Sequence, residues 1–161
     1  MNILISLFLL VGVYFQTDLA TVRSNFEKAG DSKENTTIFY NSLKDYNGKD
    51  NTIAAYKGAA FALQARYTGD RKHKKELFVA GAKDLEAAIT KDPTNVELRF
   101  IRLIIQENTP KILKYKGDLT TDKQMIITSF AKQPTVVKEA IKRYALKKST
   151  LFTAAELRKL N

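Results

Sequence analysis

The chain has 161 residues, of which 44% are hydrophobic and 27% are charged, and it contains no cysteine. A chain of this length can bury about two-thirds of its unfolded surface in one domain, and its apolar fraction excludes a disordered protein. The lack of cysteine excludes disulfides, a thiol nucleophile and a thiolate zinc site, and the single histidine excludes a mechanism that needs two imidazoles. The net charge of +10 favours acidic partners.

The first sixteen residues predict a secretory signal peptide. Residues 3–15 read ILISLFLLVGVYF and carry no charge. A helix of that length spans about 20 Å, less than the hydrocarbon core of ~30 Å, and is typical of a signal-peptide apolar segment. We expect residues 1–16 to be removed, with cleavage between 16 and 20, and residues 17–161 to form a single exported domain, periplasmic or secreted. The alternatives are a membrane anchor made by an uncleaved leader and an ordinary buried first helix.

After the leader the sequence predicts a row of helices, because apolar residues recur at intervals of three and four and no alternating stretch has the length of a strand. We expect the first helix to start near Asp18 and to end at Gly30. The second is expected to be capped by Asp31 or Ser32 and to end at the pair Asn47-Gly48 through a left-handed C-cap.

The third predicted helix begins near residue 50 and ends near 67. Ala54, Gly58 and Ala62 share one stripe of this helix and would let a neighbouring helix approach closely. The fourth runs from residue 71 to about 91 and ends before Pro93. Its predicted buried face consists of Leu77, Phe78, Gly81, Leu85, Ala88 and Ile89.

The fifth predicted helix, VELRFIRLIIQE, is apolar on nearly every side, so we expect it at the centre of the fold. Thr94 and Glu97 are predicted to form a capping box at its start. Three shorter elements follow: a helical turn ending at Gly117, a helix opened by Asp122 as its cap, and a helix that begins after Pro134.

The last predicted helix starts at a second capping box, formed by Thr153 and Glu156. Together these elements predict an all-α protein without a domain boundary.

Residues 81–100, GAKDLEAAITKDPTNVELRF, resemble the second helix and the inter-repeat turn of a tetratricopeptide repeat. Gly81, Leu85, Ala88 and Ile89 match the small, large, small and apolar positions of that helix, and residues 92–95 match its turn. The resemblance covers one helix and one turn. It implies antiparallel helical hairpins stacked as a short tetratricopeptide-like array or as an irregular helical bundle. More loosely, the leader and the stretch KDPTNVELRFIRL are similar to small exported helical proteins of bacteria.

Basic side chains of the central helices are the candidate ligand contacts. Arg99 and Arg102 are three residues apart and share a helix face. In tetratricopeptide-like domains such residues can bind a peptide carboxylate, so the resemblance implies this role for both. Lys57, Arg66 and Lys83 would contribute if the third and fourth helices line the same groove. The alternative is that Arg99 and Arg102 form intramolecular ion pairs that hold helices in register.

A second candidate is the basic run at residues 71–75, which is a possible anion-binding patch for phosphate, nucleic acid or acidic lipid. Its cationic members are Arg71, Lys72, Lys74 and Lys75. The alternative is a solvated first turn of a helix. His73 lacks partners of its own kind and is not expected to bind a metal ion.

Paired carboxylates, a serine in a glycine elbow and a glycine-rich phosphate loop were not found with supporting context. We therefore expect no catalysis, cofactor, metal or small-molecule substrate. The predicted function is that of an exported scaffold that binds a protein or peptide through a helical groove. The alternative is a basic protein that associates with anionic lipid or other polyanionic surfaces through helices such as 138–148. Few exported proteins meet nucleic acid, so we do not expect it as a partner.

Overall fold

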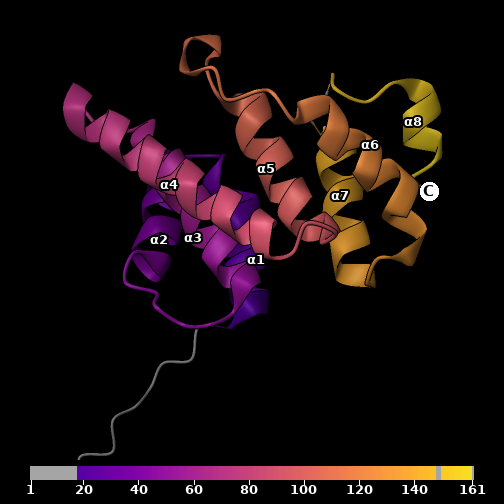
Figure 1. Ribbon diagram of the computed structural model, residues 1–161, viewed down its shortest axis with the longest axis horizontal. Helices are drawn as coiled ribbons and strands as arrows, with labels where there is room; N and C mark the ends of the chain where they lie inside the picture. The colour runs from indigo at the N-terminus through magenta and orange to yellow at the C-terminus, as the bar shows by residue number, and fades with distance from the viewer. Residues whose placement is uncertain (1–17, 148–149, 161) are drawn as a thin grey trace, which may run out of the picture.

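The computed structural model describes residues 18–147 and 150–160, and over these residues the chain is helical without a strand (Figure 1). The predicted all-α fold class is therefore confirmed. The predicted signal peptide, residues 1–16, lies outside the described residues. No helix within the described ranges combines the length and the apolar character that crossing a bilayer requires.

The helices follow one another with short connections, and α5 lies between α1–α4 on one side and α6–α8 on the other (Figure 1). In chain order the elements are α1 (Leu19–Ala29), α2 (Lys33–Leu43), α3 (Asn51–Ala65), α4 (Arg71–Lys91), α5 (Val96–Asn108), the 3₁₀ turn η1 (Lys111–Leu113), α6 (Leu119–Ser129), the 3₁₀ turn η2 (Phe130–Lys132), α7 (Thr135–Lys147) and α8 (Ala154–Arg158).

Polar side chains define where several helices start. Asp18, Ser32 and Asp50 each accept hydrogen bonds from backbone N–H groups in the first turns of α1, α2 and α3. Thr153 and Glu156 form the predicted capping box of α8. These N–H groups have no partner within their own helix, so each cap stabilises its helix by about 1 kcal/mol. The predicted starts of these four helices are confirmed.

The crossing of α3 and α4 brings the two backbones into direct contact. A Cβ atom added to Gly81 would lie 2.4 Å from the carbonyl oxygen of Gly58 and 2.7 Å from the backbone nitrogen of Ala62. The two backbones therefore touch where neither residue has a side chain. The predicted small stripe makes this contact through Gly58 and Ala62, whereas Ala54 is only partly buried.

The helix α5 belongs to both hydrophobic cores. Leu98 and Ile101 pack into a core shared by α1–α5, while Phe100 and Leu103 pack into a second core shared by α5–α8. Ile104 contacts both. A helix with apolar residues on opposite sides is buried on both, so the predicted central position of this segment is confirmed.

The predicted capping box at the start of α5 is wrong. The N-cap is Asn95, whose side-chain oxygen accepts the N–H of Glu97 at 3.0 Å and that of Leu98 at 3.4 Å. Glu97 does not reach back toward Thr94, because its carboxylate is bound by Arg23 of α1. A long-range ion pair has replaced the local bond that the sequence pattern indicates.

Two further local predictions are wrong. The helix α2 ends at Leu43, and Gly48 does not adopt a positive φ. An added Cβ at Gly48 would lie 2.5 Å from Oη of Tyr46, so a larger residue there would displace the end of that side chain. The helix α6 starts at Leu119, so Asp122 lies inside it, is fully buried and does not cap a helix start.

Candidate functional site

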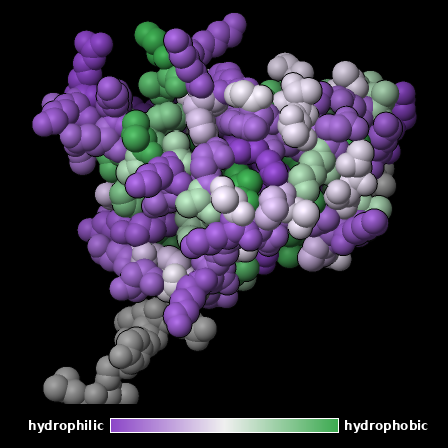
Figure 2. Space-filling model, in the orientation of Figure 1, coloured by the Kyte–Doolittle hydropathy of each residue, from purple (hydrophilic) through white to green (hydrophobic). Residues whose placement is uncertain are grey.

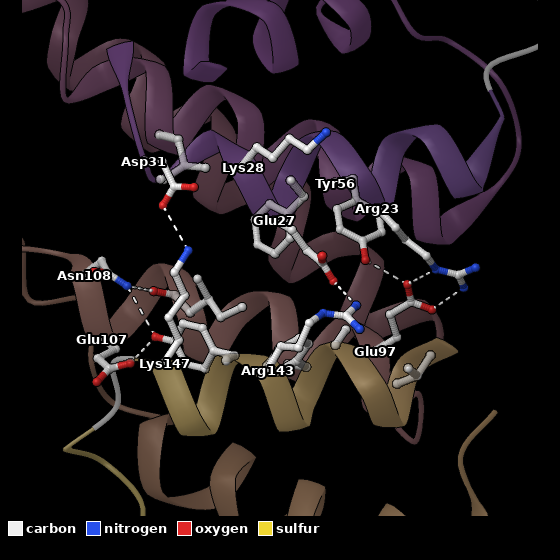
Figure 3. A pocket seen from close by; sticks show the side chains of 18 of the residues that line it. Arg23, Glu27, Lys28, Asp31, Tyr56, Glu97, Glu107, Asn108, Arg143 and Lys147 are labelled. Carbon is white, nitrogen blue, oxygen red and sulfur yellow. Dashed lines mark hydrogen bonds and ion pairs between the residues drawn. The ribbon is translucent and has the colours of Figure 1, made fainter. Parts of the chain in front are cut away.

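A cleft of about 750 Å³ lies between α1 and α7, and residues of α3 and α5 line the space between them (Figure 3). This volume falls in the range of ligand-binding pockets, roughly 300–1,000 Å³. Apolar side chains from all four helices contribute to the walls: Phe26, Leu63, Phe100, Ile104, Val136, Val137 and Ala140. The cleft is therefore a tertiary feature that brings together the first and the seventh helix of the chain.

One end of the cleft is built around the carboxylate of Glu97, which is 8% exposed. Arg23 binds both of its oxygens, each at 2.7 Å, and Tyr56 donates its hydroxyl to Oε1 at 2.8 Å (Figure 3). Burial and the neighbouring carboxylate raise the pKa of Tyr56, so its phenol remains a donor. The hydrogen bonds to Glu97 raise the pKa of Arg23. This end is a preorganised, charge-assisted network.

The other end of the cleft is formed by Tyr144 of α7 with Glu107 and Asn108 of α5. The Tyr144 hydroxyl donates to the Glu107 carboxylate, and Nδ2 of Asn108 lies 3.4 Å from the same hydroxyl (Figure 3). Burial, followed by the bond to Glu107, raises the pKa of Tyr144. Its ring packs edge-on against Phe100, with centroids 5.7 Å apart. Polar groups thus mark both ends of an apolar cleft.

Two ion pairs to α7 cross the mouth of the cleft, one from α1 and one from the turn that follows α1. Arg143 binds Glu27 at 2.5 Å, and Lys147 binds Asp31 at 3.4 Å (Figure 3). Each pair joins residues 116 positions apart. Arg143 and Lys147 are four residues apart on α7 and share a face, whereas Asp31 lies in the turn just after the C-terminus of α1. The four side chains are 41–60% exposed. Exposed pairs contribute about 0–1 kcal/mol each, so a ligand that offers its own charges can replace them at little cost.

The charges that line the cleft are mixed in sign, and the acidic groups are engaged. Its charged residues are Arg23, Lys28, Arg66, Arg143 and Lys147 on the basic side and Glu27, Asp31, Glu97 and Glu107 on the acidic side. Each of these carboxylates contacts an arginine, a lysine or a tyrosine hydroxyl. The arrangement can recognise a ligand with apolar and polar groups through contacts and hydrogen bonds.

The predicted contact residues Arg99 and Arg102 lie outside the cleft and are brought together on Asp122. Arg102 binds Asp122 through Nε at 2.7 Å and Nη2 at 2.8 Å, and Arg99 binds the same carboxylate at 3.2 Å. Arg102 also binds Glu86 at 2.6 Å and lies 3.4 Å from Asp118. Burial opposes the charge of Arg102, but Asp122 and the other carboxylates outweigh it and raise its pKa. These contacts are the helix-to-helix ion pairs that the alternative interpretation expects, between α5, α4 and α6.

The other three predicted contact residues do not converge. Arg66 lines the cleft at the C-terminus of α3. Lys57 donates to the carbonyl of Tyr46 at 2.8 Å and does not line the cleft. Lys83 is exposed on α4, also outside it. The groove between the third and fourth helices that would unite them is filled by their close crossing at the two glycines.

The predicted anion patch lies on the first turn of α4, where all its members are exposed: Arg71, Lys72, Lys74 and Lys75. Asp70 caps this turn and accepts the N–H of His73 at 2.6 Å. His73 lies 3.8 Å from Glu76. The patch is remote from the cleft between α1 and α7 in sequence and in the fold (Figure 1).

Of the residues that line the cleft, the sequence predicts only Arg66 as a ligand contact. The sequence patterns predict Asp31 as a helix cap and Glu97 as part of a capping box, and they assign no specific contact to Arg143. The sequence contains one indication of the two ion pairs. Glu27 and Asp31 place two negative charges four residues apart, and Arg143 and Lys147 place two positive charges at the same spacing. Nothing in the sequence indicates that these two faces meet.

Within residues 18–147 and 150–160, no three His, Asp or Glu side chains lie close enough together to hold a metal ion. No protein-family model matches the sequence, and comparisons with characterised proteins and with solved structures find no match either.

Proposed function

We propose that the protein is a non-catalytic binding protein whose cleft between α1 and α7 takes a short peptide segment of a partner protein. The observation that carries the proposal is the construction of the cleft. Its walls are apolar, its two ends hold preorganised polar networks, and its mouth is crossed only by exposed ion pairs among the residues that line it. Such a site has the mixed apolar and polar lining that is common in ligand pockets.

The lining favours a peptide over a purely apolar or a purely anionic ligand. Phe26, Phe100 and Val137 offer surface for apolar side chains. The mouth of the cleft carries two carboxylates and two cations, which form the two ion pairs described above. A peptide with charges of both signs can replace these ion pairs with its own. The hydroxyl and amide oxygens at the ends can accept hydrogen bonds from peptide N–H groups, since the protons of these groups are already donated within the protein.

We propose no catalysis because the carboxylates and phenols of the cleft are hydrogen-bonded to one another or to basic side chains. A general base must reach a substrate proton, and a nucleophile needs an adjacent base. Here Glu97 accepts three hydrogen bonds, from Arg23 and Tyr56. The Glu97 carboxylate is therefore suited to joining α5 to α1 and α3 and to positioning a ligand, rather than to accepting a proton.

We further propose that the helices are stacked hairpins of the tetratricopeptide-like kind and that the protein acts after export. The extensive contact between the consecutive helices α3 and α4 and the turn at residues 92–95 support the first point. The apolar leader at residues 3–15 supports the second. Cell fractionation, with the mass of the purified product, tests export: a cytosolic protein that retains residue 1 would contradict it.

The binding proposal is tested by selecting peptides from a random library against residues 17–161 and mapping the best binder by ¹H–¹⁵N chemical-shift changes. The largest changes should fall on residues that line the cleft. Replacing Ala140 by Phe places a ring in the cleft, and Ala87→Phe on the exposed face of α4 is the matched control. We expect at least a tenfold loss of affinity for the first variant and less than twofold for the control.

A second blocking variant guards against loss of folding. If Ala140→Phe lowers the unfolding temperature, Val136→Trp replaces it, because Val136 lines the cleft and is 46% exposed. The proposal is wrong if selected peptides bind both blocked variants as tightly as the unmodified protein, or if no peptide binds the folded protein at millimolar concentration.

A further inference from the structure

The turn η1 presents apolar side chains to solvent at one end of the molecule. Ile112 is 86% exposed and Leu113 is 42% exposed. The loop that carries them projects beyond α4 and α5 (Figure 1), and Figure 2 shows hydrophobic side chains at that end between hydrophilic ones. Contiguous exposed apolar side chains that are rimmed by polar residues can mark a site of interaction with a protein or a membrane.

The same loop is basic. Residues 111–116 read KILKYK, and no acidic residue occurs between 108 and 117. Lys111 and Lys114 flank the apolar pair directly and are exposed. Lys114 has a φ of 50°, in the left-handed region, which turns the chain sharply after Leu113 and keeps the pair at the tip. We call residues 111–114 the η1 tip.

The η1 tip is held in place by its neighbour Tyr115. The Tyr115 ring packs edge-on against Phe78 of α4, with centroids 5.7 Å apart, and its hydroxyl donates to Glu86 at 2.6 Å. Lys116 donates to the carbonyl of Glu107 at 2.9 Å. The loop is thereby fixed against α4 and α5, so Ile112 and Leu113 remain at the surface.

The contact with Phe78 also places the η1 tip beside the N-terminal half of α4. That half carries the exposed basic run at residues 71–75 and Val79, which is 54% exposed. Both segments lie at the same end of the molecule in Figure 1. One end of this protein of net charge +10 thus carries the apolar pair of the η1 tip, the lysine rim formed by Lys111 and Lys114, and the basic run at residues 71–75.

We propose that this end of the molecule docks on a lipid bilayer that contains anionic lipids. Ile112 and Leu113 enter the boundary between headgroups and acyl chains, and Lys111 and Lys114 contact the negative headgroups. The commitment to a bilayer rests on charge complementarity and on shape, because an interfacial segment combines buried apolar groups with cations at headgroup level. The surface is separate from the cleft between α1 and α7, so both can be occupied at once.

Vesicle co-sedimentation with residues 17–161 tests the proposal. Unilamellar vesicles of phosphatidylcholine, with and without phosphatidylglycerol, are compared for the unmodified protein and for Ile112→Ser/Leu113→Ser, which keeps every charge. We expect binding only to the anionic vesicles and at least a tenfold lower partition coefficient for the variant. Unchanged binding of this variant would overturn the proposal, as would an unmodified protein that does not bind the anionic vesicles.

The contribution of the lysine rim is separated from that of net charge by a matched pair of variants. Lys111→Gln/Lys114→Gln removes two charges at the tip, and Lys49→Gln/Lys132→Gln removes two exposed charges elsewhere. Each lysine at the surface contributes about fivefold to binding, from roughly 1 kcal/mol. We expect a loss of tenfold or more for the first pair and of less than threefold for the second. Equal losses would show non-specific attraction of a cation and overturn the proposal.

A single tryptophan reports insertion directly, because the chain contains none. Ile112→Trp should show a blue-shifted emission on anionic vesicles and quenching by lipids brominated on their acyl chains. Leu146→Trp on α7, whose native side chain is 75% exposed, is the control and should show neither. A tryptophan at 112 that remains in water while the protein is bound would contradict docking through the η1 tip.

Discussion

The crossing of α3 and α4 depends on the absence of side chains at Gly58 and Gly81, and Gly81→Ala tests this. The new Cβ would lie 2.4 Å from the Gly58 oxygen, whereas ordinary contact begins near 3.4 Å, so the backbones must separate by about 1 Å. A gap of this size forfeits up to about half of the dispersion energy between the facing atoms. Overpacking lowers the free energy of unfolding by about 1–3 kcal/mol, and by more where the obstacle is rigid backbone. The better helix propensity of alanine offsets up to ~1 kcal/mol of this loss.

We therefore expect Gly81→Ala to lower the free energy of unfolding by about 2 kcal/mol, which for a domain of this size lowers Tm by roughly 4–8 °C. Urea unfolding followed by circular dichroism measures it. Gly58→Ala should act in the same direction, since its Cβ would lie 2.6 Å from the Gly81 oxygen. The double variant should cost less than the two single costs combined, because one helix separation relieves both contacts.

The matched control is Gly30→Ala at the C-terminus of α1. Nothing lies within 4 Å of an added Cβ there, and φ is −73°, which alanine adopts readily. We expect this change to be neutral or to stabilise the protein by about 0.4–1 kcal/mol, because alanine lowers the conformational entropy of the unfolded chain. A Gly81→Ala protein as stable as the unmodified one, or a Gly30→Ala protein destabilised to the same degree, would refute the steric reasoning.

Three further predictions concern the ion pairs and the buried phenols. Asp122→Asn leaves Arg102 buried without its full partner and should cost about 3 kcal/mol of unfolding free energy, whereas Asp118→Asn, at a side chain that is 50% exposed, should cost less than about 1 kcal/mol in the same urea titration. A double-mutant cycle on Glu27→Gln and Arg143→Gln should give a coupling below about 1 kcal/mol that disappears at high salt, and a larger, salt-resistant value would show that this pair holds the cleft shut. The free energy of unfolding should fall as pH rises above about 10. The buried phenols keep their protons in the folded state because their pKa values are raised, whereas in the unfolded chain they lose them near the ordinary tyrosine pKa of 10.0. Urea midpoints that stay constant between about pH 9 and 11 would contradict this. The phenols concerned are those of Tyr56, Tyr115 and Tyr144.

Several predictions that rest on neighbouring residues are confirmed, but a distant partner overturned two of them, at Glu97 and at Asp122. Asp50 caps α3 because its acceptor and the N–H groups it serves lie within three residues of each other. Asp122 was assigned as a cap on the same reasoning, but the fold places it opposite Arg102 and Arg99, and a buried carboxylate beside two guanidinium groups forms an ion pair. The two cases are indistinguishable in sequence.

The candidate cleft shows the same division. Arg66 was predicted as a contact residue and lines the cleft, whereas Arg99 and Arg102, on the opposite side of α5, do not. Helical periodicity places residues on a common face of one helix, but it does not say which helix covers that face. The cleft exists because α7 returns to α1, and the pair Glu27 with Arg143 spans 116 positions.

The sequence by itself determined the all-α class, most helix starts and the central position of α5, since periodicity, capping and apolar content act over a few residues and require no knowledge of the fold. The tertiary structure alone decided which charges are buried as pairs, where the cleft lies and that Ile112 stays in solvent. Those outcomes depend on contacts between helices far apart in the chain, and the energy of a charge or an apolar group is set by what surrounds it after packing.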